Sequence, residues 1–204
     1  MKSYIRYTLP VLIASVALVN TVTFAEDKPA PNVVDPKMAE IMKKAEAAGA
    51  PGDAHKALRP LAGEWNAEVK SWMAPGAPPI VSKGTAKATW VMDGRYLQEE
   101  FHGDFMGKPF HGMSLMGYDN LTKRYNSVWI DNMSTVMVKT EGEAGKDGKV
   151  LTLTGTYACP MTGEMHKQTK QVLRIISEDH HVFEMHDPTK GENSKEMEIT
   201  YTRK

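Results

Sequence analysis

From Gly63 to the C-terminus the sequence alternates between apolar and polar side chains with a period of two. In the first segment Trp65, Ala67 and Val69 fall on one face, and Glu64 falls on the other. This period is typical of a β-strand that buries one face. Ten strand-like segments follow one another, at approximately 63–73, 84–92, 95–105, 109–117, 124–132, 135–142, 149–157, 166–177, 180–186 and 195–203.

Short turn signals separate these segments, and no helical pattern lies between them. Gly, Pro, Asn and Asp gather at 119–120, 145–148, 160–163 and 188–191, where they favour tight connections. Ten evenly spaced strands joined in this way indicate an antiparallel barrel or sandwich. Closure is favoured because a closed sheet leaves no exposed edge. We therefore predict an all-β fold, a single antiparallel β-barrel of about ten strands.

The N-terminus has the pattern of a secretory signal peptide. Lys2 and Arg6 form a short basic region, an apolar run covers 9–22, and the small residues Thr23 and Ala25 occupy the positions that signal peptidase reads. The run is too short and too interrupted for a membrane span, and no later window approaches spanning length. We expect residues 1–25 to be removed by cleavage near Ala25, which predicts a periplasmic or secreted protein.

The charge balance of the remaining chain argues against nucleic acid as a partner. Without residues 1–25 the chain has 23 basic and 25 acidic residues, a net charge of −2 with His neutral. Phosphate binding needs a clustered positive surface. The single cysteine, Cys159, excludes an internal disulfide. Stability must therefore come from the hydrophobic core, which a domain of this size can supply.

Residues 26–57 are predicted to be a leader that contains one amphipathic helix, at about 35–49. Asp35 suits the N-cap and Pro36 the first helical position. Gly49 and Pro51 end the pattern. The apolar stripe is narrow, and we expect the helix to lie against or near the barrel domain, which spans 58–204.

Seven short motifs resemble a known bacterial family, in the same order along the chain. They are Leu61-Ala62-Gly63-Glu64-Trp65, Gly94-Arg95-Tyr96-Leu97-Gln98-Glu99-Glu100, Met106-Gly107-Lys108-Pro109-Phe110, Gly117-Tyr118-Asp119-Asn120, Trp129-Ile130-Asp131-Asn132-Met133, Pro160-Met161-Thr162-Gly163 and Met197-Glu198-Ile199-Thr200-Tyr201. Over nearly all of residues 55–204 the chain resembles the family called domain of unknown function 1579. The resemblance implies a lipocalin-like β-barrel, often exported, and it implies no activity.

Glu99 is the most informative polar position of the predicted barrel. If Leu97 and Phe101 face the core, period two turns Glu99 inward as well. A buried carboxylate needs a partner, and Arg174, Arg203, Tyr201 or a tryptophan N–H could provide one. Two alternatives stay open: Glu100 turns inward instead, or Glu99 lies in water at a barrel mouth.

The inward positions mix small and large side chains, which is compatible with a pocket or with a filled core. Barrels of eight or more strands can hold one small ligand. The leading hypothesis is an exported module that binds a small, largely apolar molecule. Its apolar wall would be Trp65, Trp90, Phe101 and Trp129, and its polar anchors Glu99, Asp131 and Tyr201, with His111 as a further candidate. The alternative is a filled barrel with a structural or partner-binding role.

A second hypothesis concerns copper. Cys159, Met161, Met165 and His166 cluster around one predicted turn, and thiolate, thioether and imidazole are ligands that monovalent copper prefers. Against this, methionine also fills gaps in protein cores.

Enzyme signatures are mostly absent. The stretch from Gly112 to Met116 lacks the second glycine of a nucleophile elbow, and it lies in a strand pattern without a following helix. The sequence thus favours binding over catalysis.

Overall fold

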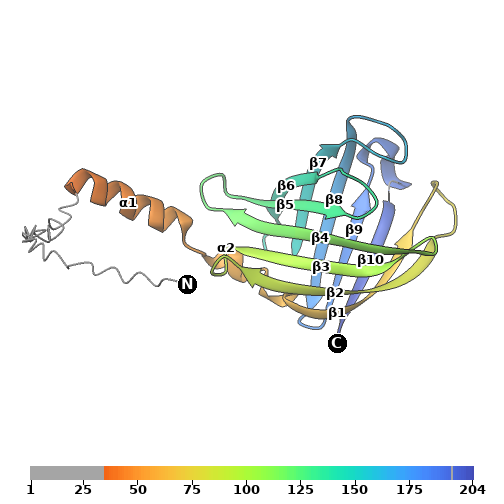
Figure 1. The fold of residues 1–204 in the computed structure, drawn as a ribbon, viewed down its shortest axis with the longest axis horizontal. Coiled ribbons are helices and arrows are strands. Elements are labelled where there is room, and N and C mark those ends of the chain that lie inside the picture. The colour runs from red at the N-terminus through yellow and green to blue at the C-terminus, as the bar shows by residue number, and fades with distance from the viewer. Residues whose placement is uncertain (1–34, 194) are drawn as a thin grey trace, which may run out of the picture.

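The computed structural model describes residues 35–193 and 195–204, and within them the chain forms a closed antiparallel β-barrel (Figure 1). The predicted signal peptide at residues 1–25 lies outside the described residues. The strands are β1 (Gly63–Ser71), β2 (Ile80–Val91), β3 (Tyr96–Phe105), β4 (Lys108–Asp119), β5 (Arg124–Asp131), β6 (Val138–Ala144), β7 (Val150–Tyr157), β8 (Lys167–Ser177), β9 (His180–His186) and β10 (Lys195–Arg203). The prediction of a ten-stranded all-β barrel is confirmed.

Each strand pairs with its neighbours in sequence, and β1 pairs with β10 to close the barrel. The closing ladder is antiparallel and runs from the pair Trp65–Arg203 to the pair Ser71–Met197. Every strand therefore has a partner on both sides, so the sheet has no free edge.

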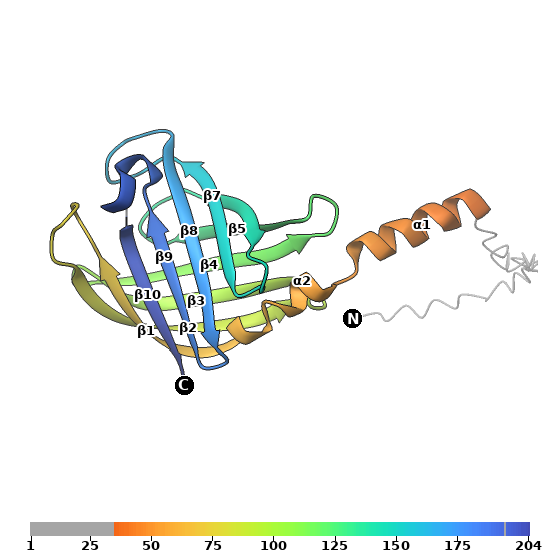
Figure 2. The same ribbon diagram turned by 180° about the vertical axis from the view of Figure 1, so that it is seen from behind.

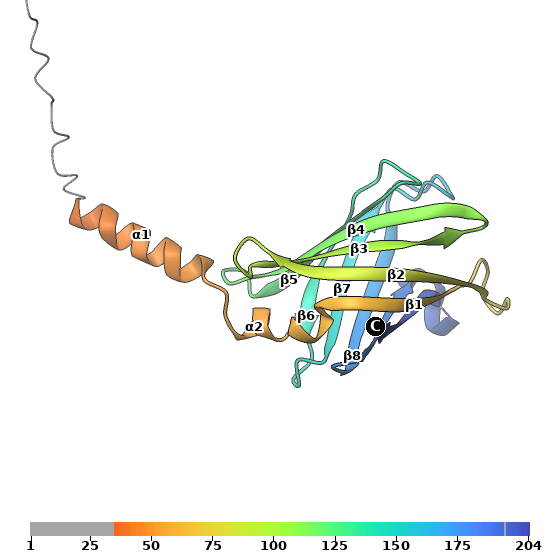
Figure 3. The same ribbon diagram turned by 60° about the horizontal axis from the view of Figure 1, so that its bottom comes forward.

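One end of the barrel is closed by the segment that precedes β1, and we call it the plugged end. The short helix α2 (Asp53–Lys56) and the 3-10 turn η1 (Arg59–Leu61) lie there (Figure 3). Leu58 is fully buried and Leu61 is 4% exposed. They pack into a cluster with buried side chains from the strands: Ala88, Leu97, Tyr125, Leu151, Leu153, Leu173 and Ile175.

The opposite end of the barrel, which we call the rim, carries the other set of connections. An up-and-down barrel alternates its connections between two ends, so the segments 72–79, 106–107, 132–137 and 158–166 and the turn η2 (Pro188–Asn193) meet at the rim. Between the rim and the plugged end lies a second cluster of buried side chains: Trp65, Ala67, Ala86, Phe101, Ile199 and Tyr201.

The helix α1 (Pro36–Gly49) extends away from the plugged end and buries none of its residues (Figures 1 and 2). Its N-terminus is capped by Asp35, whose carboxylate accepts a hydrogen bond from the backbone N–H of Lys37 at 2.9 Å. Its C-terminal end is tied to the barrel by Asn120, whose side-chain amide donates to the carbonyls of Ala48 and Ala50, at 2.8 Å each. The predicted helix therefore exists, and Asn120 holds its C-terminal end near the barrel.

Across the described ranges, no helix has the length and apolarity needed to cross a bilayer.

Candidate ligand-binding site

Glu99 lies on the inner face of β3, between the buried side chains of Leu97 and Phe101. Its neighbour Glu100 is exposed on the outer face. The hydroxyl of Tyr201, on β10, donates a hydrogen bond to Glu99 Oε1 at 3.3 Å. Of the four partners that the sequence suggested, the structure therefore selects Tyr201.

Burial raises the pKa of Glu99 to about 7, and the hydrogen bond from Tyr201 opposes that shift only in part. The residue nevertheless keeps some accessible surface. The two observations agree if the carboxyl lies deep among protein atoms and faces a space inside the barrel rather than bulk water. Burial and the nearby carboxyl of Glu99 likewise raise the pKa of Tyr201, so its hydroxyl keeps its proton.

Other inward-facing side chains also keep accessible surface. Ser114 on β4, Trp129 on β5, Met185 on β9 and Met197 on β10 are half-buried, whereas Leu151 and Leu153 near the plug are at most 2% exposed. An inward-facing side chain is accessible only where the interior is not filled. Accessible interior surface therefore lies beside Glu99, at Ser114 and Trp129, and also at the plugged end, where Trp90, Met116 and Tyr118 are half-buried.

Three aromatic side chains line the interior beside Glu99, and we call them the aromatic wall: Phe101, Phe110 and Trp129. The rings of Phe101 and Phe110 meet at 6.0 Å edge to face, and the rings of Phe110 and Trp129 stack at 6.3 Å. The Trp129 ring covers Gly112, where an added Cβ would stand 2.3 Å from Trp129 Cζ2. Only glycine at position 112 lets the indole lie in this place.

The row Glu99–Ser114–Trp129 runs straight across three strands, because these residues are register partners in the β3–β4 and β4–β5 ladders. Neighbouring strands lie about 4.8 Å apart. The Trp129 indole reaches from β5 over Gly112 of β4, and Ser114 is the small side chain between Trp129 and Glu99 in this row.

Trp65 and Trp90 occupy more structural positions than predicted. Trp65 is fully buried, and its Nε1 donates to the carbonyl of Leu61 at 2.9 Å. The Arg203 guanidinium lies 4.2 Å from the Trp65 ring, and it donates to the carbonyls of Ala62 and Pro60, which holds the plug against β10. Trp90 packs on the cluster at the plugged end. Both side chains face inward, but they support the core.

His181 extends the polar group that contains Glu99 and Tyr201. Its ring stacks on Tyr201 at 4.3 Å and meets Trp65 edge-on at 4.4 Å. Burial, followed by the nearby charges of His180 and Arg203, lowers the pKa of His181 to about 3, so its imidazole is neutral. Its Nδ1 is buried and has no hydrogen-bond partner among the described residues. His181 shares the inward face of β9 with Phe183 and Met185, but it was not among the predicted site residues.

Of the two remaining predicted anchors, Asp131 lies on the inner face of β5 and His111 lies on the outer face of β4. Asp131 accepts hydrogen bonds from Trp129 Nε1 at 3.0 Å and from the backbone N–H groups of Met133 and Ser134. It thereby holds the indole and the β5–β6 connection. His111 lies on the outer face of β4, where it is exposed and stacks on His102. Its side chain therefore does not enter the barrel, because Gly112 takes the inward position.

The four predicted copper ligands have unequal exposure. Cys159 is 6% exposed, whereas Met161 and Met165 are 67% and 68% exposed and His166 is also exposed. Burial by itself would raise the pKa of the Cys159 thiol, but hydrogen bonds from Thr162 and Met161 and the charge of Lys167 bring it below its ordinary value. Binding of monovalent copper by this turn stays a prediction. The described residues contain no group of three or more His, Cys, Asp or Glu side chains that could hold a metal ion.

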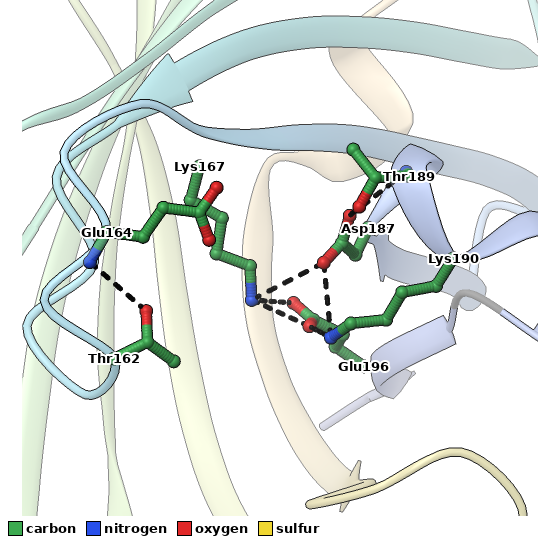
Figure 4. A network of polar contacts seen from close by, with 7 residues as sticks. All are labelled: Thr162, Glu164, Lys167, Asp187, Thr189, Lys190 and Glu196. Atoms are coloured by element: carbon green, nitrogen blue, oxygen red, sulfur yellow. Dashed lines mark hydrogen bonds and ion pairs between the residues drawn. The ribbon is translucent and has the colours of Figure 1, made fainter.

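A network of ion pairs at the rim was not anticipated (Figure 4). Lys167 Nζ contacts both carboxylate oxygens of Glu196, at 2.6 and 2.8 Å. Lys190 Nζ lies 2.8 Å from Glu196 and 3.1 Å from Asp187, and Thr189 donates to Asp187. The β9–β10 ladder shifts between Lys195 and Met197, which makes Glu196 the extra residue of a bulge. Such a shift breaks period two, so the sequence pattern gave no signal for this network.

Two depressions also lie on the outside of the barrel. One, of about 750 Å³, covers the outer face of β10, β1, β2 and β3 and includes Glu68, Lys83 and His102. The other, of about 490 Å³, lies between α2 and the strands β4 to β6 and includes Tyr118 and Arg124. Neither lining includes Glu99 or a residue of the aromatic wall.

A closed, up-and-down antiparallel barrel places the chain in the class of lipocalin-like β-barrels. Within that class, the chain belongs to the family described as "Protein of unknown function (DUF1579)", whose sequence model matches residues 50–203. A comparison with curated proteins gave no significant match.

Among solved structures, the one with a TM-score above 0.5 supports the fold. Rv2717c from M. tuberculosis is similar with a TM-score of 0.56 and 16% sequence identity, over 76% of this chain and 99% of that one. A redesigned β-barrel has a TM-score of 0.36 and 14% identity, over 72% and 95% of the two chains. A protein with unknown function from the DUF3598 family of Nostoc punctiforme has a TM-score of 0.34 and 14% identity, over 72% and 48%. At this identity, the likeness to Rv2717c concerns the fold alone.

Proposed function

We propose that the barrel is a binding module for a small, largely apolar molecule, held against the aromatic wall with a polar group at Glu99. The observation that carries the proposal is the state of Glu99. It is an inward carboxyl with a neutral hydrogen-bond partner, Tyr201, and it retains accessible surface inside the barrel. A pocket with apolar walls and a few fixed polar groups is typical of small-molecule sites.

The energetic cost of Glu99 supports a functional role over a structural one. A pKa raised from 4.5 to about 7 corresponds to about 3 kcal/mol against the ionised carboxyl. Structural carboxylates inside proteins usually recover such a cost through a cation or several N–H donors. Glu99 has a tyrosine hydroxyl at 3.3 Å. A polar group of a bound ligand would give the Glu99 carboxyl a further partner.

Binding of an environment-sensitive apolar dye tests the proposal. The full chain should enhance the fluorescence of Nile red, a neutral dye. Trp129→Ala should weaken the binding of Nile red about tenfold or more, since it removes one face of the wall. His111→Ala alters a neighbouring strand on its outer face and should leave binding unchanged.

Native mass spectrometry of protein purified from its host provides a second measurement. A small-molecule adduct that Trp129→Ala loses would support the proposal. Absence of both an adduct and a dye response would overturn it.

We also propose that the protein acts outside the cytoplasm, on the basis of the signal-peptide pattern at residues 1–25. N-terminal sequencing of the mature protein should begin at Glu26, and a mature chain that retains the apolar run would contradict this assignment.

A further inference from the structure

The described interior and rim contain more carboxylates than cations. Four carboxyl groups lie on inward positions or in the rim network, namely Glu99, Asp131, Asp187 and Glu196, and two lysines, Lys167 and Lys190, accompany them. Both lysines already contact carboxylates at 2.6 to 3.1 Å. Arg203 is occupied at the plugged end by the carbonyls of Pro60 and Ala62. No unpaired cation of the described interior is therefore available to an anionic ligand.

Glu99 itself has a neutral environment on each strand that packs against it. Its register partners on β2 and β4 are Ala88 and Ser114, which do not titrate. On β10 it faces the hydroxyl of Tyr201, and the stacked ring behind it is the neutral His181. The rim lysines pair with other carboxylates. A positive charge brought beside Glu99 would therefore have an uncompensated carboxyl to pair with.

The aromatic wall provides a second attraction for a positive charge. The faces of aromatic rings carry negative charge density and attract ammonium groups, with tryptophan the strongest. Trp129 lies in the same cross-strand row as Glu99, separated by Ser114, and Phe101 is the next inward residue on β3. A group placed between carboxyl and indole would contact both.

We propose that the ligand of this site is an apolar organic cation, an amine or a quaternary ammonium, whose charged group lies between Glu99 and Trp129 and whose apolar body lies on the aromatic wall. This inference rests on the proposed binding function and names the chemical class of its ligand. A carboxylate of the same shape would meet the acidic interior without a cation to receive it, and a neutral molecule would leave Glu99 unpaired.

The pH dependence of binding follows from the protonation of Glu99. A quaternary ammonium does not titrate, so any change of affinity with pH reports the protein. Since Glu99 is protonated below its pKa of about 7 in the free barrel, binding at pH 6 requires the loss of a proton. We expect affinity for the cation to rise about tenfold from pH 6 to pH 8.

The test compares three probes that share one apolar body and differ in charge: (1-naphthylmethyl)trimethylammonium, 1-naphthylmethanol and 1-naphthylacetate. The third probe is the carboxylate anion of 1-naphthaleneacetic acid. All three probes are titrated calorimetrically into the full chain at pH 6 and pH 8. At pH 8 the ammonium should bind about tenfold or more tightly than the alcohol, and the carboxylate should bind most weakly.

Glu99→Gln should abolish both the preference for the cation and its pH dependence, since it keeps the shape and removes the charge. Glu100→Gln is the matched control, because it removes a carboxylate from the adjacent, outward position, and it should keep both. Circular dichroism checks that both variants keep the β-sheet fold, and the probe series on the unmodified chain stands without them.

The outcomes separate this inference from the function on which it rests. Binding of the alcohol as tight as that of the ammonium, or tighter binding of the carboxylate, would overturn the cationic ligand and leave the binding module intact. Retention of the preference in Glu99→Gln would also overturn it. Failure of all three probes and of Nile red would overturn both.

Discussion

Glu99 and Glu100 are adjacent in β3 but have opposite environments. Glu100 is exposed on the outer face, where Gln98 donates a hydrogen bond to it at 3.1 Å. Glu99 is enclosed, and burial raises its pKa to about 7. Successive side chains of a strand point to opposite faces of the sheet. The two residues therefore compare the same carboxyl group in water and inside the barrel.

The raised pKa of Glu99 predicts a fall in stability as the pH rises. The folded state holds this proton up to about pH 7, whereas the unfolded chain releases it near 4.5. The stabilisation present at low pH is therefore lost between these values, by up to about 3 kcal/mol. Glu99→Gln should be more stable than the unmodified chain at pH 8 by about this amount, and nearly equal to it at pH 4.5.

Urea unfolding at the two pH values measures this difference. Glu100→Gln should show no such pH-dependent gain, because its carboxylate is exposed to water. An equal gain in both variants would indicate a general charge effect and contradict the burial of Glu99.

At the level of elements, α1 differs from every strand of the barrel. It buries no residue, and its apolar side chains Met38, Ile41 and Met42 are 50% to 61% exposed. Asn120 bonds to its C-terminal carbonyls. In contrast, the plug that follows buries Leu58 and Leu61 in the core. The boundary of the cooperative unit therefore lies between α1 and α2.

Two truncations test this boundary. A chain that begins at Ala50 should unfold at nearly the same urea concentration as the mature chain, with a change within about 0.5 kcal/mol. A chain that begins at Gly63 removes Leu58 and Leu61 and should lose several kcal/mol, at about 2 to 5 kcal/mol per large core side chain. A large loss in the first truncation would show that α1 stabilises the barrel.

The strands could be predicted because most have a clear face difference, as Trp65 and Ala67 have against Glu64 and Glu68. The β8 strand is the instructive exception. Its inward residues Lys167, Thr169 and Gln171 are buried but polar, so their pattern does not distinguish inside from outside. Thr140 donates to Gln171 at 3.1 Å across the interior, a contact that only the closed fold creates.

The site residues were predictable to the extent that period two holds. It placed Glu99, Phe101 and Trp129 on inward positions, and the structure has them there. It does not reveal which inward residue pairs with which, since Glu99 and Tyr201 are 102 positions apart. For His111, period two did not show which face of β4 points inward. Gly112 takes the inward position, because only a residue without a side chain leaves room for the Trp129 ring.

At the scale of the whole molecule, the rim network connects β8 with β10, two strands that do not pair with each other in the sheet. Lys167 starts β8, Glu196 belongs to β10, and Asp187 and Lys190 lie in the connection before β10 (Figure 4). The side chains of Lys167, Asp187 and Glu196 are 9%, 6% and 18% exposed. Buried charges that are paired in this way become costly once a partner is removed.

Lys167→Ala should therefore destabilise the barrel by about 3 kcal/mol, since it leaves Glu196 and Asp187 to share Lys190. Lys170→Ala is the control, because Lys170 lies on the exposed face of the same strand and its loss should cost no more than about 0.5 kcal/mol. Chemical unfolding at pH 7 measures both. Similar small losses in the two variants would contradict a stabilising role for the network.

The ladder between β1 and β10 has a consequence for synthesis. A ribosome delivers β1 long before β10, so a nascent chain can present an open sheet with two unpaired edges until β10 has been synthesised. Contacts so distant in sequence also form slowly. A truncated product that lacks β10 would therefore keep two unpaired sheet edges and would tend to associate with other copies of itself through them.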